Sequence, residues 1–159
     1  MRGFSFREAV AGDEPAIRAV VYTVLAEYGL APSPTSTDAD LDDIRASYFG
    51  RGGLFRVLTS PSDVVVGCGG LYPVDRAEAE IRKMYLLREA RGCGLGRMLL
   101  NDLVAAARER GFERVVAETA SVLQEAIGLY RSSGFVPYRR AHLASRCDQA
   151  FVLALKDTG

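Results

Sequence analysis

The sequence has few of the residues that bind metals or form disulfide frameworks. Its 159 residues include only three cysteines and one histidine. Cys68, Cys93 and Cys147 are widely separated, and no two of them have C-x-x-C spacing. Zinc sites and disulfide frameworks need closely spaced or paired ligands, so these cysteines and His142 predict that the protein binds no metal and has no disulfide framework.

An excess of charge of one sign and long apolar runs are also lacking. Twenty basic and twenty acidic side chains give a formal net charge of zero at pH 7, which offers no electrostatic case for binding nucleic acid or an acidic membrane surface. The apolar runs are far shorter than the roughly 20 residues of a transmembrane helix. The first ten residues, MRGFSFREAV, lack the apolar centre of a signal peptide. We therefore predict a cytoplasmic protein without nucleic-acid or membrane partners.

The residues that are present have the composition and periodicity of a single α/β domain over residues 1–159. A hydrophobic content of 48% is sufficient for one core in a chain of this length. Apolar periodicity and turn residues predict the element order β-α-α-β-β-β-α-β-α-β-β with a mixed sheet. The expected helices cover residues 15–28, 37–48, 95–110 and 122–131. The expected strands cover residues 4–7, 54–58, 64–66, 79–87, 115–117, 135–138 and 150–155.

Two local patterns in the first half of the chain lead to more specific expectations. Glycines at positions 67, 69 and 70 are expected to break the strand that begins at residue 64. Thr37 and Asp40 resemble a capping box that opens the second helix. They belong to an acidic run that also includes Asp38, Asp42 and Asp43. That run is interpreted either as a solvated helix N-terminus, where carboxylates suit the helix dipole, or as an attractive surface for a cationic substrate.

The segment EARGCGLGR, residues 89–97, has the features of an anion-binding loop. It connects a strand-like run to an amphipathic helix, so loop amides and the first helical N–H groups point to the same place. Gly92, Gly94 and Gly96 let the backbone approach a pyrophosphate closely, while Arg91 and Arg97 supply positive charge. The dinucleotide fingerprint G-x-G-x-x-G fails at Arg97, and a P-loop would require Gly-Lys followed by Ser or Thr.

The loop instead fits the pattern R-x-x-G-x-G, as Arg91-Gly92-Cys93-Gly94-Leu95-Gly96 after the strand AEIRKMYLL. A second segment, AIGLYRSSGFVP at residues 126–137, follows at the expected distance. Both motifs, and the order of elements over nearly the whole chain, resemble the GNAT N-acetyltransferase superfamily. The resemblance implies a mixed, mostly antiparallel sheet with a central splay, flanked by about four helices.

The resemblance also implies a cosubstrate and a binding mode. Acetyl-CoA would place its pyrophosphate in the loop formed by residues 91–97. The backbone of Met84, Tyr85 and Leu86 would pair with the pantetheine arm in the splay, and their side chains would lie in the core.

Acetyl transfer to an amine requires a proton acceptor, because an amine with a pKa near ~10.4 is less than about a thousandth neutral at pH 7. By its position in the family pattern, Glu80 is the candidate base and Glu118 is its rival; a solvent-facing carboxylate is the alternative for Glu80. Tyr130 matches the residue that protonates the departing thiolate, and its ordinary pKa near ~10 keeps it protonated at pH 7. A tyrosine that only packs between helix and sheet is the alternative for Tyr130.

Several positions leave alternatives open. Leu123 stands where relatives often carry a cofactor-binding asparagine, so Ser121 or Gln124 would have to substitute. Cys93 suggests an acetyl-cysteine intermediate, although the family generally transfers directly, and a small loop residue is the other interpretation.

The tail of the sequence and the acceptor are the least determined. His142, Arg146 and Asp148 either contact the acceptor or form a polar turn. We predict an N-acetyltransferase acting on an unidentified amine, with a non-catalytic acyl-CoA-binding module as the alternative. Whether the chain forms a homodimer stays open.

Overall fold

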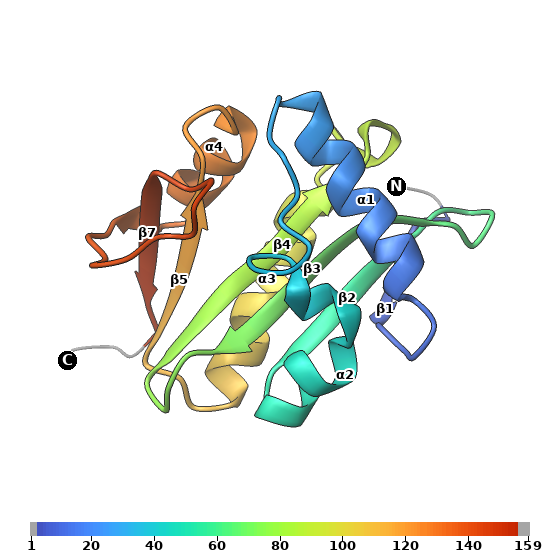
Figure 1. Ribbon diagram of the computed structural model, residues 1–159. Helices are drawn as coiled ribbons and strands as arrows, with labels where there is room; N and C mark the ends of the chain where they lie inside the picture. The colour runs from blue at the N-terminus through green and yellow to red at the C-terminus, as the bar shows by residue number, and fades with distance from the viewer. Residues whose placement is uncertain (1–2, 156–159) are drawn as a thin grey trace.

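The computed structural model describes residues 3–155, which form one seven-stranded sheet with helices on both faces (Figure 1). The ends of the predicted domain, residues 1–2 and 156–159, lie outside the described residues. The α-helices are α1 (Glu14–Glu27), α2 (Ile44–Ser47), α3 (Leu95–Glu109) and α4 (Gln124–Ser132), and the 3₁₀ helices are η1 (Ala39–Asp42), η2 (Phe49–Arg51) and η3 (Arg88–Ala90). Between residues 3 and 155, no helix combines the length and apolar character needed to cross a bilayer.

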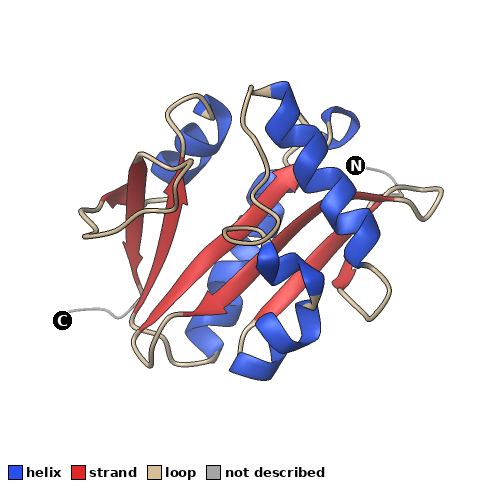
Figure 2. Cartoon of the chain, viewed as in Figure 1, coloured by secondary structure: helices blue, strands red, loops and turns tan. Residues whose placement is uncertain are grey.

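The sheet is mixed and mostly antiparallel, as predicted. Its strands are β1 (Ser5–Glu8), β2 (Leu54–Thr59), β3 (Val65–Pro73), β4 (Glu78–Leu86), β5 (Arg114–Thr119), β6 (Val136–Pro137) and β7 (Gln149–Ala154), in the spatial order β1-β2-β3-β4-β5-β7-β6. Only β4 and β5 pair in parallel. Parallel neighbours need a crossover connection, and α3 supplies it on the rear face in Figure 2.

The predicted splay lies between β4 and β5. Their pairing ends at Ile81 opposite Ala117, although β4 continues to Leu86 and β5 to Thr119. Figure 1 shows the two strands diverging beyond this point. The second half of β4 therefore has one edge without a strand partner, which leaves backbone groups accessible from that side.

A bulge in β4 marks the start of this open segment. Tyr85 pairs with Cys68 and Arg82 with Gly70, so that two residues of β4, Lys83 and Met84, oppose a single residue of β3. Lys83 has a φ of 56°, a left-handed conformation that is uncommon for a residue other than glycine. Bulges of this kind re-aim side chains and are frequent beside active sites.

The two faces of the sheet bury different helices. The α1 face packs Ile17, Val21 and Leu25 against Phe55 and Val57 of β2. On the opposite face, α3 and α4 pack against β4, β5 and β7. The helices contribute Leu99, Leu100, Leu103, Ala106, Ala107, Ile127 and Tyr130, and the strands contribute Ala79, Ile81, Val115, Ala117 and Phe151. Alternation along β4 thus directs Ala79 and Ile81 to α3, and Glu80, which lies between them, to the α1 face.

The glycines at 67, 69 and 70 do not break a strand, so that expectation is wrong. β3 runs without interruption through all three. The reason is packing: a Cβ at Gly70 would lie 2.6 Å from Tyr48 Cε1 and 2.7 Å from Phe55 Cδ2. Glycine at this position lets the two rings lie directly on the sheet, and their centroids are 4.9 Å apart.

The helix predicted over residues 37–48 is also wrong in its extent. The segment is divided into η1 and the four-residue α2, which are separated at Asp43. The side chain of Asp43 accepts a hydrogen bond from Ala46 N at 3.0 Å and caps α2. The expected capping box does not form because Asp40 is bonded to Tyr48 and Lys83 instead.

Candidate active site

The splay forms part of a cavity of about 1160 Å³. Its walls are the open half of β4, the ends of β5 and α1, the inner side of α4 and the loop over residues 138–147. Gly92 and Gly96 of the glycine loop line it together with Arg91 and Arg97. A single continuous space thus connects the loop to Glu80, Glu118 and Tyr130.

The glycine loop presents a row of unpaired backbone donors. Gly92 and Gly94 have φ of 81° and 85°, and Gly94 directly precedes the 15-residue helix α3. Within residues 3–155, none of the amides of residues 92–97 donates to a protein acceptor, whereas Met98 N donates to Gly94 O at 3.1 Å. Six consecutive N–H groups at the positive end of a helix dipole fit a phosphate or pyrophosphate.

The two arginines of the loop have protein partners. Arg91 binds Glu27 through two contacts, of 2.9 and 3.2 Å, and donates to Leu86 O at 2.8 Å. The hydrogen bonds from Arg91 lower the pKa of Glu27. Arg97 donates to the Ser132 hydroxyl of α4 at 2.7 Å. These contacts attach the loop to α1 and α4, and direct binding of phosphate by either arginine stays a prediction.

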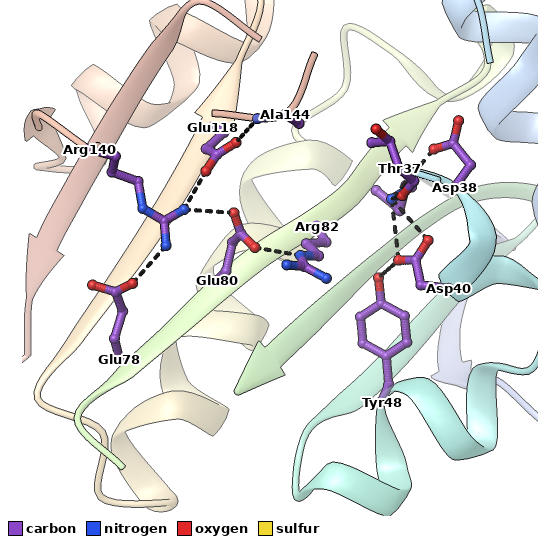
Figure 3. A network of polar contacts seen from close by, with 11 residues as sticks. Thr37, Asp38, Asp40, Tyr48, Glu78, Glu80, Arg82, Glu118, Arg140 and Ala144 are labelled. Carbon is purple, nitrogen blue, oxygen red and sulfur yellow. Dashed lines mark hydrogen bonds and ion pairs between the residues drawn. The ribbon is translucent and has the colours of Figure 1, made fainter. Parts of the chain in front are cut away.

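The two candidate bases are connected by one arginine that sequence reasoning missed. Figure 3 shows Arg140 reaching between β4 and β5. Its Nη1 contacts Glu80 Oε2 at 3.0 Å and Glu118 Oε2, and its Nη2 contacts Glu78 Oε2 at 2.8 Å. Glu80 is buried, not solvent-facing, and its other oxygen accepts from Arg82 Nε. Both oxygens of Glu80 are therefore held by guanidinium groups.

Glu118 lies across the splay from Glu80 and is likewise fully engaged. Its second oxygen accepts from Ala144 N at 2.9 Å, which ties the tail loop to β5. Glu78 belongs to the same group, and its Oε1 accepts a hydrogen bond from Arg114 Nε at 3.0 Å. Three carboxylates are thereby matched by three arginines, and these are Glu78, Glu80 and Glu118 with Arg82, Arg114 and Arg140. We call this set the glutamate cluster.

Tyr130 extends from α4 to the cavity wall. The residue is 4% exposed, and the centroid of its ring lies 5.5 Å from that of Phe135 and 6.1 Å from that of Phe151. Its hydroxyl has no hydrogen-bond partner within residues 3–155. Burial raises the pKa of Tyr130 above its ordinary value. Tyr130 is thus a packed tyrosine with a protonated hydroxyl at the cavity wall, and its role as a proton donor stays a prediction.

The acidic run contains both buried and exposed carboxylates. Its first half is neither a solvated helix N-terminus nor an attractive surface for a cationic substrate, so both interpretations from the sequence are wrong there. Asp38 is completely buried and binds Arg146 through contacts of 2.7 and 2.8 Å. Lys83 Nζ lies 3.4 Å from Asp38 and 3.1 Å from Asp40. Figure 3 shows Asp38 and Asp40 beside each other, with Tyr48 bonded to Asp40. Asp42 is 70% exposed and fits the solvated interpretation. The two buried carboxylates neither face water nor offer free charge to a substrate.

This second set, Asp38, Asp40, Lys83 and Arg146, is called the aspartate cluster. Arg146, which was a candidate acceptor contact, is here a structural partner of the buried Asp38. Although burial alone would raise it, the pKa of Asp38 is lowered by hydrogen bonds from Arg146 and Ser33 N and by the Arg146 and Lys83 charges. The cluster connects the loop before η1, the bulge of β4 and the tail loop around the cavity.

At the start of α4, Leu123 lines the cavity at the position of the missing asparagine, and Glu125 lines it as well, whereas Ser121 and Gln124 do not. Gln124 Nε2 donates to Ser121 O, and the Ser121 hydroxyl donates to Asp148. Asp148 also accepts from Ser121 N at 2.8 Å. Ser121 and Gln124, the two candidate substitutes for the missing asparagine, therefore make hydrogen bonds within this turn, and so does Asp148.

The cysteines and the histidine occupy distinct positions. Cys93 points toward Ala90 O at 3.7 Å and packs in the small core under the loop, which favours its interpretation as a small loop residue. Cys147 lines the cavity, and burial raises the pKa of its thiol to about 11, so it is protonated at neutral pH. His142 is exposed at the cavity mouth.

Comparison with known proteins identifies relatives of this chain. A family model described as "Acetyltransferase (GNAT) family" matches residues 20–135. An Escherichia coli K12 protein described as "Uncharacterized N-acetyltransferase YjgM" is 40% identical over 128 residues, which cover 77% of this chain and 76% of that protein.

Solved structures have the same fold. An acetyltransferase of the GNAT family from Staphylococcus aureus Mu50 superposes with a TM-score of 0.90 at 18% identity, over 96% of this chain and 99% of that one. The Salmonella typhimurium protein yncA, solved with acetyl-CoA, superposes with a TM-score of 0.78 at 22% identity, over 98% of this chain and 96% of that one.

Proposed function

The chain belongs to the acetyltransferase (GNAT) family and is an acyltransferase, and from this premise we propose that it transfers the acetyl group of acetyl-CoA directly to a primary amine. The observation that carries the choice of cosubstrate is the row of six unpaired amides at the mouth of the splay. A structural neighbour that was solved with acetyl-CoA supports the same assignment.

Each part of the cavity has a role in this proposal. The amides of residues 92–97 hold the pyrophosphate. The unpaired edge of β4 at Met84, Tyr85 and Leu86 bonds the pantetheine arm as an added strand would. This leaves Glu80, Glu118 and Tyr130 at the inner end, where the acetyl group and the amine would meet.

The reaction forms a C–N bond and breaks the C–S bond of the thioester. A protonated amine loses two protons, of which one ends on the CoA sulfur and the other leaves to solvent. Because both oxygens of Glu80 are engaged by arginines, we propose that a water molecule takes the proton that leaves to solvent from the amine and relays it to the glutamate cluster. Tyr130 then donates to the departing thiolate.

A non-catalytic acyl-CoA-binding module of the same fold is the alternative. The presence of both a carboxylate cluster and a cavity-lining Tyr130 favours the enzyme, since a module that only binds CoA needs neither. Thiol release from acetyl-CoA separates the two functions. We expect release with at least one primary amine from a panel of small amines, amino acids and peptides; tight CoA binding without release from any of them would favour the module.

The loop assignment predicts the effect of Gly94→Val. A β-branched side chain at a φ of 85° strains the loop and turns its amides away from the ligand. We expect affinity for CoA to fall at least about 10-fold by calorimetry, which is the loss of one or two charge-assisted hydrogen bonds. Gly111→Val is the matched control, because Gly111 has a φ of 82°, equally open surroundings and a position at the far end of α3. Equal affinities in the two variants would contradict the assignment.

Other features stay predictions from the sequence. These are the extension of one acetyltransferase domain over residues 1–159, the cytoplasmic location, the lack of a metal and of nucleic-acid or membrane partners, and the choice between monomer and homodimer.

A further inference from the structure

Two arginines and a tyrosine form one wall of the cavity next to Glu80. Tyr72 of β3 lies directly opposite Glu80 in the sheet. The guanidinium carbon of Arg82 is 3.6 Å from the centroid of the Tyr72 ring, and that of Arg51 is 4.6 Å from it. All three residues line the cavity. This wall lies at the Glu80 end of β4, away from the glycine loop, and therefore on the side from which an acceptor would meet the acetyl group.

Positive charge exceeds negative charge around this wall. Within the glutamate cluster every carboxylate has an arginine, and within the aspartate cluster Lys83 and Arg146 match the two carboxylates. Arg51 is exposed, and among residues 3–155 it has no carboxylate partner. Because both buried clusters are neutral as sets, Arg51 gives this end of the cavity a net positive charge.

Arg82 also has unused donors. Its Nε is bonded to Glu80 and one face of its guanidinium lies on Tyr72. Its two terminal nitrogens have no acceptor in the described part of the chain, and a third of the side chain is exposed. A guanidinium with free terminal N–H groups binds a carboxylate well, because the planar donors match both oxygens.

We propose that the acceptor is an α-amino acid whose carboxylate binds at Arg82 and Arg51 while its amine faces Glu80. The inference rests on the proposed acetyl transfer. Arg82 contacts Glu80 through Nε, and its two terminal nitrogens belong to the same guanidinium. A carboxylate bound to these nitrogens therefore lies close to an amine that is directed at Glu80. This short separation is the one that the carboxylate and the amine have in an α-amino acid. The product is the N-acetyl amino acid, and the protons are distributed as described above.

The same charges disfavour an acceptor that is only cationic. A polyamine or a lysine side chain would bring further positive charge to a wall whose carboxylate, Glu80, is already held by Arg82 and Arg140. Like charges in a partly desolvated site repel each other. The α-ammonium and α-carboxylate charges of an amino acid cancel each other, and its carboxylate compensates Arg51.

The test compares each common L-α-amino acid with its α-amide as acceptor in a thiol-release assay with acetyl-CoA. With the best acceptor, we expect the acid to exceed the amide in kcat/KM by about 10- to 100-fold, the usual effect of a hydrogen-bonded charge pair. Arg51→Gln should raise KM for the acid several-fold and leave kcat and the KM of the amide nearly unchanged. Arg45→Gln is the control, because Arg45 is exposed on the adjacent α2 and does not line the cavity.

The outcomes separate the two proposals. Equal use of acids and amides, or an Arg51→Gln variant with unchanged KM, would overturn the carboxylate site and leave acetyl transfer intact. If no amine releases thiol, acetyl transfer fails, and calorimetric titration of the amino acids into the protein saturated with CoA decides the carboxylate site. Binding that Arg51→Gln weakens would support that site, and lack of binding would overturn it.

Discussion

Replacement of Tyr130 by phenylalanine is expected to lower kcat by about 10²- to 10⁴-fold, the usual contribution of one positioned proton donor. Affinity for acetyl-CoA should stay nearly the same, because the ring that lines the cavity is retained. The change should also cost little stability, since the hydroxyl has no hydrogen-bond partner within residues 3–155 and the packing on Phe135 and Phe151 is kept. Steady-state thiol release at saturating acetyl-CoA measures the effect.

The pH profile gives this test a second readout. Burial raises the pKa of Tyr130 above its ordinary value, so the phenol stays protonated from about pH 7 to about pH 10. The variant should therefore be slower at every pH in this range by a similar factor. Tyr22→Phe, on α1 and away from the cavity, should leave kcat unchanged. A kcat for Tyr130→Phe within about twofold of the wild type would remove Tyr130 from the mechanism.

The sequence predicted those parts of the site that depend on neighbouring residues. The glycine loop, α3 and the position of Tyr130 on α4 each have a signal within about a dozen residues, namely closely spaced glycines, amphipathic periodicity and a turn after the helix. Because these signals agree in order and distance with the pattern of the GNAT superfamily, the resemblance also implied the splayed, mostly antiparallel sheet. Among the elements, the extent of the second helix, the edges of other elements and the role of the glycines in β3 were wrong. In β3, packing on Tyr48 overrides local preference.

The charged clusters could not be predicted in this way. Arg146 and Asp38 are 108 residues apart in the sequence, and Arg140 is 60 residues from Glu80. A run of aspartates before a helix has the same local pattern whether its carboxylates are solvated or buried. The difference arises only when the bulge at Lys83 directs a lysine toward the run from another element. Identification of such partners requires the tertiary structure.

The aspartate cluster determines how the cavity wall next to Glu80 is held together. The walls of the cavity include the loop before η1 and the tail loop, and the aspartate cluster connects both of them to β4. Buried ion pairs add little net stability relative to apolar packing, yet removal of one partner is costly because a buried charge is left uncompensated. The clusters thus fix the relative position of β4 and the two loops more than they increase the stability of the fold.

This arrangement predicts a large effect for Asp38→Asn. The substitution keeps the shape of the side chain and removes the charge that faces Arg146 and Lys83 at a fully buried position. We expect the free energy of unfolding to fall by about 3–5 kcal/mol, the usual cost of breaking one partner of a buried pair. Denaturation with urea measures the loss. The control is Asp42→Asn, whose carboxylate is 70% exposed and 3.9 Å from Arg18, and it should change stability by less than about 1 kcal/mol.

The same pair predicts how stability depends on pH. The pKa of Asp38 is lower in the folded protein than in the unfolded chain, so the unfolded chain takes up the proton first as the pH falls. The contribution of Asp38 is therefore complete above about pH 5, about one unit above the ordinary value for aspartate, and is lost as the pH falls toward the lowered pKa of the folded protein. Asp38→Asn should consequently lose less stability than the wild type between about pH 5 and about pH 2. Parallel acid-denaturation curves for the two proteins, or a loss at neutral pH no larger than that of Asp42→Asn, would mean that the buried pair does not hold these loops in place.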